Sequence, residues 1–408
     1  MPTVNPDILK WARETAGLTL EDAAAKLDIG EARGVPGVTR LAAYEAGERE
    51  PSRPLLVRMA KQYRRPLLTF YMSKAPRLGE RGQDFRTLPP EHSAAQDALV
   101  DALIRDVRAR QQMVRAALED EEETVRLPFV ASMTMRQGVD AVLQSIQQTL
   151  DLDLEQYRGR HSGDRGPGGF AYLREQAEKV GIYVLLIGNL GSHHTSLDVE
   201  VFRGFALADD VAPFIVINDQ DAVTAWAFTL LHELCHIWLG ATGVSGATAG
   251  TAVEQFCNDV AGRFFLPANE VDGLRDLRDA KFDAVVARIN DFAEVRHISR
   301  SMVAYKLYRE GIIERDLWSR LTALYRSHWR GAREAQRERN RDHEGGPNYY
   351  VVKRHRLGEA LVSLARRMLA EGAMSPSKAG KVLGVKPSNV YGLVSTDIGP
   401  APLRSAQG

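Results

Sequence analysis

Two histidines four residues apart, His232 and His236, lie in an apolar stretch with the residue spacing of a helix. Side chains at this spacing share one helix face, about 5–6 Å apart at Cβ, so both imidazoles can bind one metal ion. Glu233 directly follows the first histidine and can reach a metal-bound water as a general base. This short motif predicts a metal site on a mostly buried helix over residues 221–239.

A catalytic zinc ion needs a third protein ligand and one open position. Glu254 lies 18 residues beyond His236, on a second expected helix at 252–265. A run of small residues at 241–251 supplies the turn between the two helices. We expect Glu254 to be the third ligand and Asn258, one helical turn later, to orient a ligand.

Such a site has the groups needed to hydrolyse an amide bond. Zn²⁺ lowers the pKa of a bound water to about 7 and polarises the scissile carbonyl. Glu233 would take the proton of that water and later pass it to the leaving amine. We expect the apolar strand Phe214–Ile217, just before the helix, to align an extended peptide by edge addition. Imidazole and carboxylate also suit other divalent ions, so the identity of the metal stays open.

Other polar or sulfur-containing side chains near the motif have simpler interpretations. Cys235 and Cys257 are the two cysteines of the chain, and we interpret each as a small buried hydrophobic residue rather than a ligand. Two cysteines make no disulfide framework, which fits a reducing compartment. His193 and His194 lie in a polar loop, where we expect solvated side chains; a role on the substrate side is the alternative.

The composition is that of a globular protein with balanced charge. The chain has 408 residues, of which 44% are hydrophobic, and Lys+Arg 53 equal Asp+Glu 53. This length predicts two or three domains, and the zero net charge excludes a chain-wide basic surface for nucleic acid. There is no apolar run of about 18 residues and no signal-peptide pattern. We therefore expect a cytoplasmic protein without a membrane span.

The first part of the chain, residues 6–72, has the organisation of a helix-turn-helix domain. The second of its two short helices would enter the major groove of DNA. By residue type, the candidate DNA contacts are Thr39, Arg40 and Tyr44, with Lys61, Arg64 and Arg65 at the phosphates. The alternative is a helical bundle used for protein contact.

The turn between these two helices is unusually long. The segment Gly30–Gly37 exceeds the usual turn of about 3–4 residues before a recognition helix. We expect this insertion to displace the second helix and to weaken base reading.

The C-terminal residues 374–394 resemble a second, smaller helix-turn-helix. Ser375 can cap a first helix, and Lys386 begins a second one. The alternative, preferred on the sequence, is an antiparallel helix pair that caps the neighbouring domain or mediates dimerisation. Turn-linked helix pairs recur near 19–46, 284–310 and 359–394, but no repeat of fixed period is found.

Several stretches resemble a family of two-part proteins. A resemblance to the Xre-family helix-turn-helix fused to metallopeptidases is carried by GLTLEDAAAKL, TRLAAYEAGEREPS and LVRMAKQYRRPLLTFYM. A resemblance to the ImmA/IrrE family is carried by DFRTLP, EVFRGFALADDVAPFIVINDQDAVTAWAFTLLHELCHIWLG and EQFCNDVAGRFFLP. Together these stretches cover most of residues 6–320.

The resemblance implies a zinc peptidase of the gluzincin type. On the matching positions, zinc would be held by His232, His236 and Glu254, and Glu233 would be the base. Members of the family cut transcriptional repressors of the helix-turn-helix type and so release stress-response or mobile-element genes. The implied partners are a protein substrate and DNA. Similar proteins also act as transcriptional regulators, so a regulator whose peptidase-like domain is a sensor or dimerisation body is the alternative.

The expected fold is therefore α+β and mostly helical. A helix-turn-helix bundle is joined to a gluzincin-like zinc peptidase domain with a small sheet, and a helical C-terminal region follows. The expected segments are a helix-turn-helix domain at 1–73, a linker at 74–98, a metallopeptidase domain at 99–326, a polar linker at 327–349 and a helical segment at 350–408. DNA contact is expected through the first segment, and the sequence sets no oligomeric state.

Overall fold

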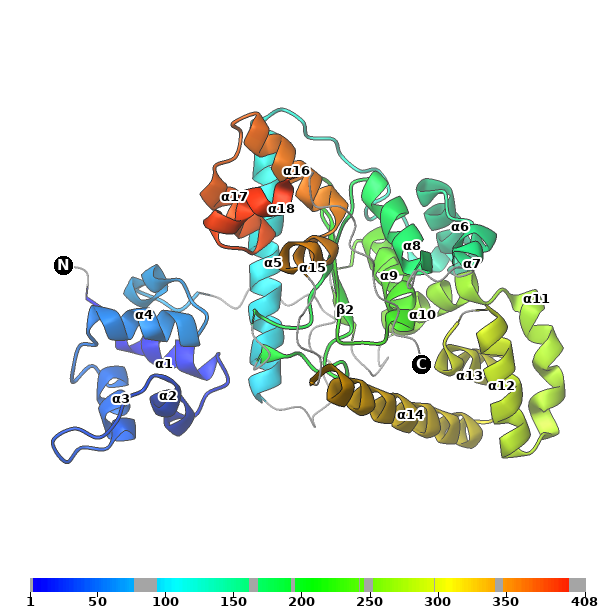
Figure 1. Ribbon diagram of the computed structural model, residues 1–408, viewed down its shortest axis with the longest axis horizontal. Helices are drawn as coiled ribbons and strands as arrows, with labels where there is room; N and C mark the ends of the chain where they lie inside the picture. Colours follow the sequence, from blue (N-terminus) through cyan, green and yellow to red (C-terminus); the bar gives the residue numbers. More distant parts are fainter. Residues whose placement is uncertain are drawn as a thin grey trace. The chain divides into compact units, whose positions relative to one another are not determined.

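The computed structural model describes most of the chain, namely residues 3–76, 94–160, 168–191, 195–241, 243–245, 252–296, 298–341 and 348–395. The chain divides into two compact units: Met1–Arg108 with Asn189–Phe202, and Ala109–Gly188 with Arg203–Gly408. Figure 1 shows their helices and strands. Within the described residues, no helix is long and apolar enough to cross a membrane.

Some of the predicted features lie outside the described residues. They are most of the expected linker at 74–98, the stretch DFRTLP within it, part of the polar linker at 327–349, and most of the small-residue turn at 241–251.

The first unit begins with the bundle expected at the N-terminus. Its helices are α1 (Pro6–Glu14), α2 (Leu20–Lys26), α3 (Gly37–Glu45), α4 (Arg53–Gln62) and the 3-10 helix η1 (Leu67–Tyr71). The side chains of Asn5, Thr19 and Ser52 cap α1, α2 and α4, because each accepts a hydrogen bond from a first-turn N–H. α3 packs against α1 and α2 around one apolar core, as a helix-turn-helix requires.

The long turn before α3 is an ordered hairpin. Ala32 and Val35 exchange two backbone hydrogen bonds of 3.1 Å, with two residues of positive φ between them. At the base, a Cβ added to Gly37 would lie only 1.7 Å from the Ile29 carbonyl oxygen. The insertion therefore closes on itself, and α3 begins directly beside the end of α2.

The second unit is built on a four-stranded sheet with the order β1-β3-β2-β4. β3 (Phe214–Ile217) is parallel to β1 (Tyr183–Leu186) and antiparallel to β2 (Gly204–Leu207), and β4 (Gly243–Ser245) is antiparallel to β2. The expectation that Phe214–Ile217 aligns a peptide by edge addition is wrong. This strand lies inside the sheet, where both sides of its backbone are already paired with β1 and β2.

One long helix packs on this sheet, and a second long helix packs on the first. α9 (Val223–Leu239) contacts β2 and β3, and α10 (Ala252–Phe265) packs along α9. Every residue of β1, β2 and β3 is buried. Gly240 ends α9 in the left-handed region, with φ 65°. The expected mostly helical α+β fold with a small sheet is confirmed.

The remaining helices complete the second unit or lead into it. In chain order they are α5 (Ala94–Asp120), η3 (Met135–Gln137), α6 (Val139–Leu150), α7 (Leu154–Gly159), α8 (Gly168–Lys179), α11 (Ala268–Val271), η5 (Asp272–Asp279), α12 (Phe282–Arg296), α13 (Arg300–Arg309), α14 (Arg315–Arg341), α15 (Tyr349–Leu357), α16 (Glu359–Ala370), α17 (Pro376–Leu383), η6 (Pro387–Asn389) and α18 (Val390–Val394).

A buried ion pair on α8 anchors the C-terminal helices. Arg174 and Glu178 are 3.0 Å apart. The Arg174 guanidinium donates to the His355 carbonyl at 2.6 Å. The Glu178 carboxylate accepts the backbone N–H groups of Glu359 and Ala360 at 3.0 and 3.1 Å, and so caps α16. Two charged side chains thus fix α15 and α16 against the peptidase-like part of the unit.

Candidate metal centre

The predicted metal ligands lie on the two packed helices α9 and α10. His232, Glu233 and His236 belong to α9, and Glu254 lies in the first turn of α10. Their exposed fractions are 3%, 0%, 0% and 6%. Burying four such polar groups carries a large desolvation cost unless they are paired or bind a metal. Their joint burial therefore indicates a metal-binding site.

The facing atoms of three of these side chains have the separations of metal ligands. His232 Nε2 and His236 Nε2 are 3.1 Å apart. The Glu254 oxygens lie 3.3 Å from His232 Nε2 and 3.1 Å from His236 Nε2. Ligands about 2.0–2.1 Å from a tetrahedral ion are about 3.3 Å from one another. Two nitrogens and one carboxylate thus fit three corners of a tetrahedral site.

The Glu254 carboxylate is held in its charged form. Burial alone raises its pKa, but hydrogen bonding and electrostatic attraction from His232 and His236 outweigh burial and lower the pKa to about 2. Metal ligands bind in their deprotonated form. Glu254 is therefore ready to bind a cation at neutral pH.

Glu233 lies next to a glycine of strand β2. A Cβ added to Gly204 would lie 2.8 Å from Glu233 Oε1 and 2.7 Å from Thr229 Cγ2. A glycine inside a strand often marks such a close approach of another group. Gly204 was not predicted from the sequence, although its place at the start of an apolar strand was a usable signal.

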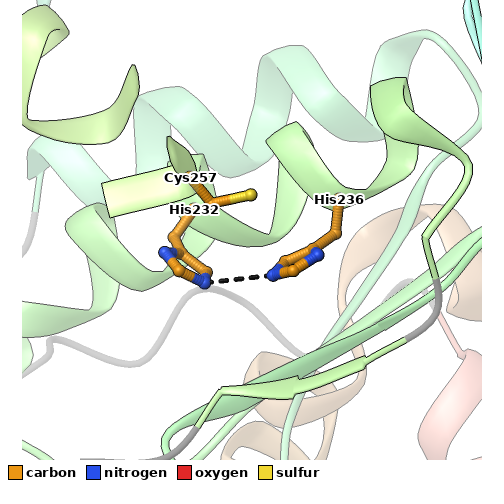
Figure 2. A group of neighbouring side chains, drawn as sticks. All are labelled: His232, His236 and Cys257. Atoms are coloured by element: carbon orange, nitrogen blue, oxygen red, sulfur yellow. Dashed lines mark hydrogen bonds between the residues drawn. The ribbon is translucent and has the colours of Figure 1, made fainter. Parts of the chain in front are cut away.

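A sulfur atom also lies beside the two imidazoles. Cys257, on α10, is fully buried, and its Sγ lies within 4.8 Å of a ring nitrogen of both His232 and His236. Figure 2 shows the two rings facing each other, with the sulfur to one side of the line that joins them. Burial raises the pKa of the Cys257 thiol well above its usual value, and the neighbouring Cys235 adds to this. The position of its sulfur makes Cys257 an alternative third ligand, a role that the sequence interpretation set aside in favour of packing.

The other residues predicted near the site are less directly placed. Asn258 is partly exposed on α10, one turn after Glu254, and its orienting role stays a prediction. His193 and His194 lie outside the described residues.

The predicted DNA contacts on α3 differ in their surroundings. Thr39 is exposed. Arg40 Nη1 donates to the Gly30 carbonyl at 2.8 Å, which ties α3 to the base of the hairpin. Tyr44 packs against the core of the domain. Of these three side chains, Thr39 is the one on the open surface, and the DNA-contact role of all three stays a prediction.

The predicted phosphate contacts differ as well. Arg65 lies over the Trp11 ring at 4.3 Å and donates to Thr15 Oγ1 at 2.9 Å. Burial lowers the pKa of Arg65 to about 10. Lys61 is exposed and Arg64 is partly buried. A structural role for Arg65 is therefore established by its contacts, and the phosphate contacts remain predictions.

Fold and site together define a helix-turn-helix protein with a metallopeptidase-like domain. Comparison with family models gives the same division: residues 9–70 match the helix-turn-helix model, and residues 177–308 match the IrrE N-terminal-like domain of the peptidase M78 family. The chain thus carries an Xre-type helix-turn-helix domain followed by an IrrE N-terminal-like domain, as the resemblance predicted. No curated protein and no solved structure matches the chain.

Proposed function

We propose that this protein is a zinc-dependent endopeptidase that cleaves a regulatory protein, with helix-turn-helix repressors as the substrate class. The observation that carries the proposal is the convergence of His232 Nε2, His236 Nε2 and the Glu254 carboxylate within 3.3 Å of one another. Glu233 follows His232 on α9 and is fully buried. The match of residues 177–308 to a peptidase family supports the same conclusion.

His232, His236 and Glu254 would hold the ion. A bound zinc supplies a water of lowered pKa and polarises the scissile carbonyl. Glu233 accepts a proton from the attacking water and passes it to the leaving amine. Gly204 leaves the space in which the Glu233 carboxylate sits.

Glu254 is the preferred third ligand over Cys257. Its oxygens are at ligand distance from both imidazoles, whereas the Cys257 Sγ is placed only within 4.8 Å of their ring nitrogens. Binding by both side chains would give four protein ligands, which is typical of a closed, structural zinc site. A hydrolase needs the fourth position for water, so we assign Cys257 to packing.

An extended peptide substrate would pair with an edge of the sheet. β1 is an edge strand, but α15 contacts it. β4, which follows α9, is the other edge strand, and we assign the aligning role to its backbone.

The test compares new protein N-termini in cells that express the wild type or Glu233→Gln with a panel of helix-turn-helix repressors. The wild type is expected to cut a repressor, and Glu233→Gln to bind zinc normally and cut none. Glu294→Gln, a change at an exposed position of α12, is the matched control and keeps cleavage. Cleavage that survives Glu233→Gln, with normal zinc content, would refute the mechanism.

A second candidate function is transcriptional regulation by DNA binding, with the peptidase-like domain as a sensor or dimerisation body. The match of residues 9–70 to a helix-turn-helix model favours it. A salt-dependent mobility shift of DNA from the protein's own promoter tests this function. No shift at low salt would exclude it, and a shift is compatible with peptidase activity in the same chain.

A further inference from the structure

The C-terminal helices α16, α17 and α18 lie outside both family matches. Figure 1 shows them as a group of short helices at the end of the described chain. We propose that residues 359–395 form a second helix-turn-helix, and that it binds double-stranded DNA through the exposed side of η6 and α18. This binding site is independent of whether the metal centre cuts peptides.

The start of α17 repeats the start of α2. Thr19 caps α2 by accepting the Asp22 N–H at 3.1 Å. Ser375 caps α17 by accepting the Lys378 N–H at 3.2 Å. Both the caps and their donors are 356 positions apart, since 375 − 19 and 378 − 22 give the same number.

The turn after each helix is also the same. The Ile29 N–H donates to the Ala24 carbonyl at 2.9 Å, and the Val385 N–H donates to the Gly380 carbonyl at 2.8 Å. In each turn the residue before the donor has left-handed backbone, with φ 53° at 28 and 59° at 384. These positions keep the offset of 356, so the two helices end in the same type of turn.

The buried residues also match in the two segments that lead up to these turns. At the same offset, the buried residues Ala12, Leu18 and Leu27 correspond to the buried residues Met368, Met374 and Leu383. Helices α16 and α17 therefore have buried residues at the same positions as α1 and α2 of the N-terminal helix-turn-helix domain.

Residues 359–395 lack an insertion like Gly30–Gly37 of the N-terminal domain. Three residues, 384–386, separate α17 from η6. This is the short turn of about 3–4 residues found in DNA-binding helix-turn-helix units. A Cβ on Gly380 would lie 2.9 Å from the Val385 carbonyl oxygen, so glycine lets the turn lie close against α17.

The turn residue Lys386 and the exposed side of η6 and α18 have the chemistry of a DNA-binding surface. Lys386, Ser388 and Tyr391 are exposed, and Tyr391 is 62% exposed. Val390 and Leu393 on the other side are fully buried. Residues 372–395 contain three lysines and no acidic residue. Basic side chains at such a surface pair with phosphates, and hydroxyl and aromatic groups contact phosphates and bases.

The lysines of this surface do not contribute equally. Lys378 lies 4.0 Å from Asp120 of α5, which offsets its charge. Lys381 and Lys386 are exposed and are the phosphate contacts that we assign. Because Arg174 and Glu178 anchor α15 and α16 to α8, DNA on this surface would be held in a fixed relation to the peptidase-like domain.

The experiment measures binding of the full chain to a labelled mixed-sequence duplex of about 30 base pairs by fluorescence anisotropy over a range of salt. The chain carries Thr39→Glu and Arg40→Glu, which replaces two of the predicted contacts of the N-terminal domain by acidic side chains. Adding Lys381→Glu and Lys386→Glu is expected to weaken binding about tenfold or more at low salt. It should also reduce the salt slope by about 2, since each phosphate contact contributes about 0.9.

The matched control adds Lys179→Glu and Lys281→Glu, the same charge change at exposed positions of α8 and next to α12, and keeps the slope. Tyr391→Ala, which changes no charge, provides a second test and is expected to weaken binding with an unchanged circular dichroism spectrum. An unchanged slope and affinity in folded protein would overturn the proposal. So would a change of oligomeric state in sedimentation with unchanged DNA binding, because the surface would then be a protein interface.

Discussion

The metal centre and the N-terminal helix-turn-helix domain differ in the kinds of side chain that they bury. In the metal centre the polar groups are inside: Glu233 and His236 are fully buried. In the N-terminal domain the core is mainly apolar, with the buried Arg13 paired to Glu45 at 2.8 Å, and a candidate contact such as Thr39 is exposed. Buried polar groups are costly and need a compensating partner, so their arrangement indicates a chemistry. An exposed polar side chain carries little desolvation cost at any position, so its function is revealed only by the partner that it binds.

The largest expected effect tests whether the buried carboxylate is a ligand. Glu254→Gln removes the charged group that lies 3.1–3.3 Å from both imidazoles. We expect zinc affinity to fall more than about a hundredfold, since changes to outer-shell partners alone cost about 10–100-fold. Competition with a chelator measures this affinity. Cys257→Ala is the matched change on the same helix and should retain zinc. If Cys257→Ala lost zinc and Glu254→Gln retained it, Cys257 would be the ligand in place of Glu254.

The next effect concerns the position of the buried base. Gly204→Ala places a methyl group within 2.8 Å of Glu233 Oε1, so the carboxylate must shift. We expect kcat to fall by about 10–100-fold with normal zinc content, because a displacement of about 1 Å can cost about a hundredfold. Gly262→Ala on α10 is the control, since a Cβ there meets no atom of the described residues within 4 Å. Equal activity of both variants would argue against the assigned place of Glu233.

A smaller effect is expected at the exposed surface of the N-terminal domain. Thr39→Glu should weaken DNA binding about tenfold through repulsion from the phosphates, and leave zinc content and cleavage unchanged. Anisotropy with a labelled promoter duplex measures the affinity. Val57→Glu, which puts the same charge on exposed α4, is the control. If both variants bind DNA as the wild type does, α3 is not the recognition helix.

The smallest effect concerns a second carboxylate of the peptidase-like unit. Hydrogen bonds from Arg158 and Arg296, at 3.0 and 2.6 Å, outweigh the burial of Glu270 and lower its pKa. Its stabilisation is therefore complete above the unfolded pKa of about 4.3 and is lost as the pH falls below that value. We expect Glu270→Gln to reduce the stability difference between pH 7 and pH 3 by about 1 kcal/mol.

Thermal unfolding at the two pH values measures this difference. Glu294→Gln, at an exposed position, should leave it unchanged. A Glu270→Gln protein with the wild-type pH dependence would show that this carboxylate does not stabilise the fold through its charge.

The sequence alone predicted the parts of the site that local geometry controls. The spacing of His232 and His236 places both rings on one helix face, and Glu254 could be proposed because α10 follows a short turn. The position of Phe214–Ile217 inside the sheet could not be foreseen, because strand order depends on pairings between distant segments. The same holds for Gly204 and Cys257, whose neighbours come from other elements.

The sequence showed turn-linked helix pairs near both ends of the chain, but not the constant offset between their positions. The three paired core positions share burial, but only Leu27 and Leu383 are identical. The insertion Gly30–Gly37 adds residues before α3, so α3 and η6 no longer keep the offset of 356 positions. A repeat carried by backbone hydrogen bonds and left-handed turn residues becomes visible only in the structure.

The central claim is that the metal centre holds one zinc through two imidazoles and one carboxylate, with the last position left for water. X-ray absorption at the zinc edge on the purified full chain tests this claim most directly. The account predicts four nitrogen or oxygen neighbours at about 2.0–2.1 Å, with the outer-shell signature of two imidazoles. A sulfur neighbour at about 2.3 Å would contradict it, because Cys257 would then occupy a position assigned to Glu254 or to water.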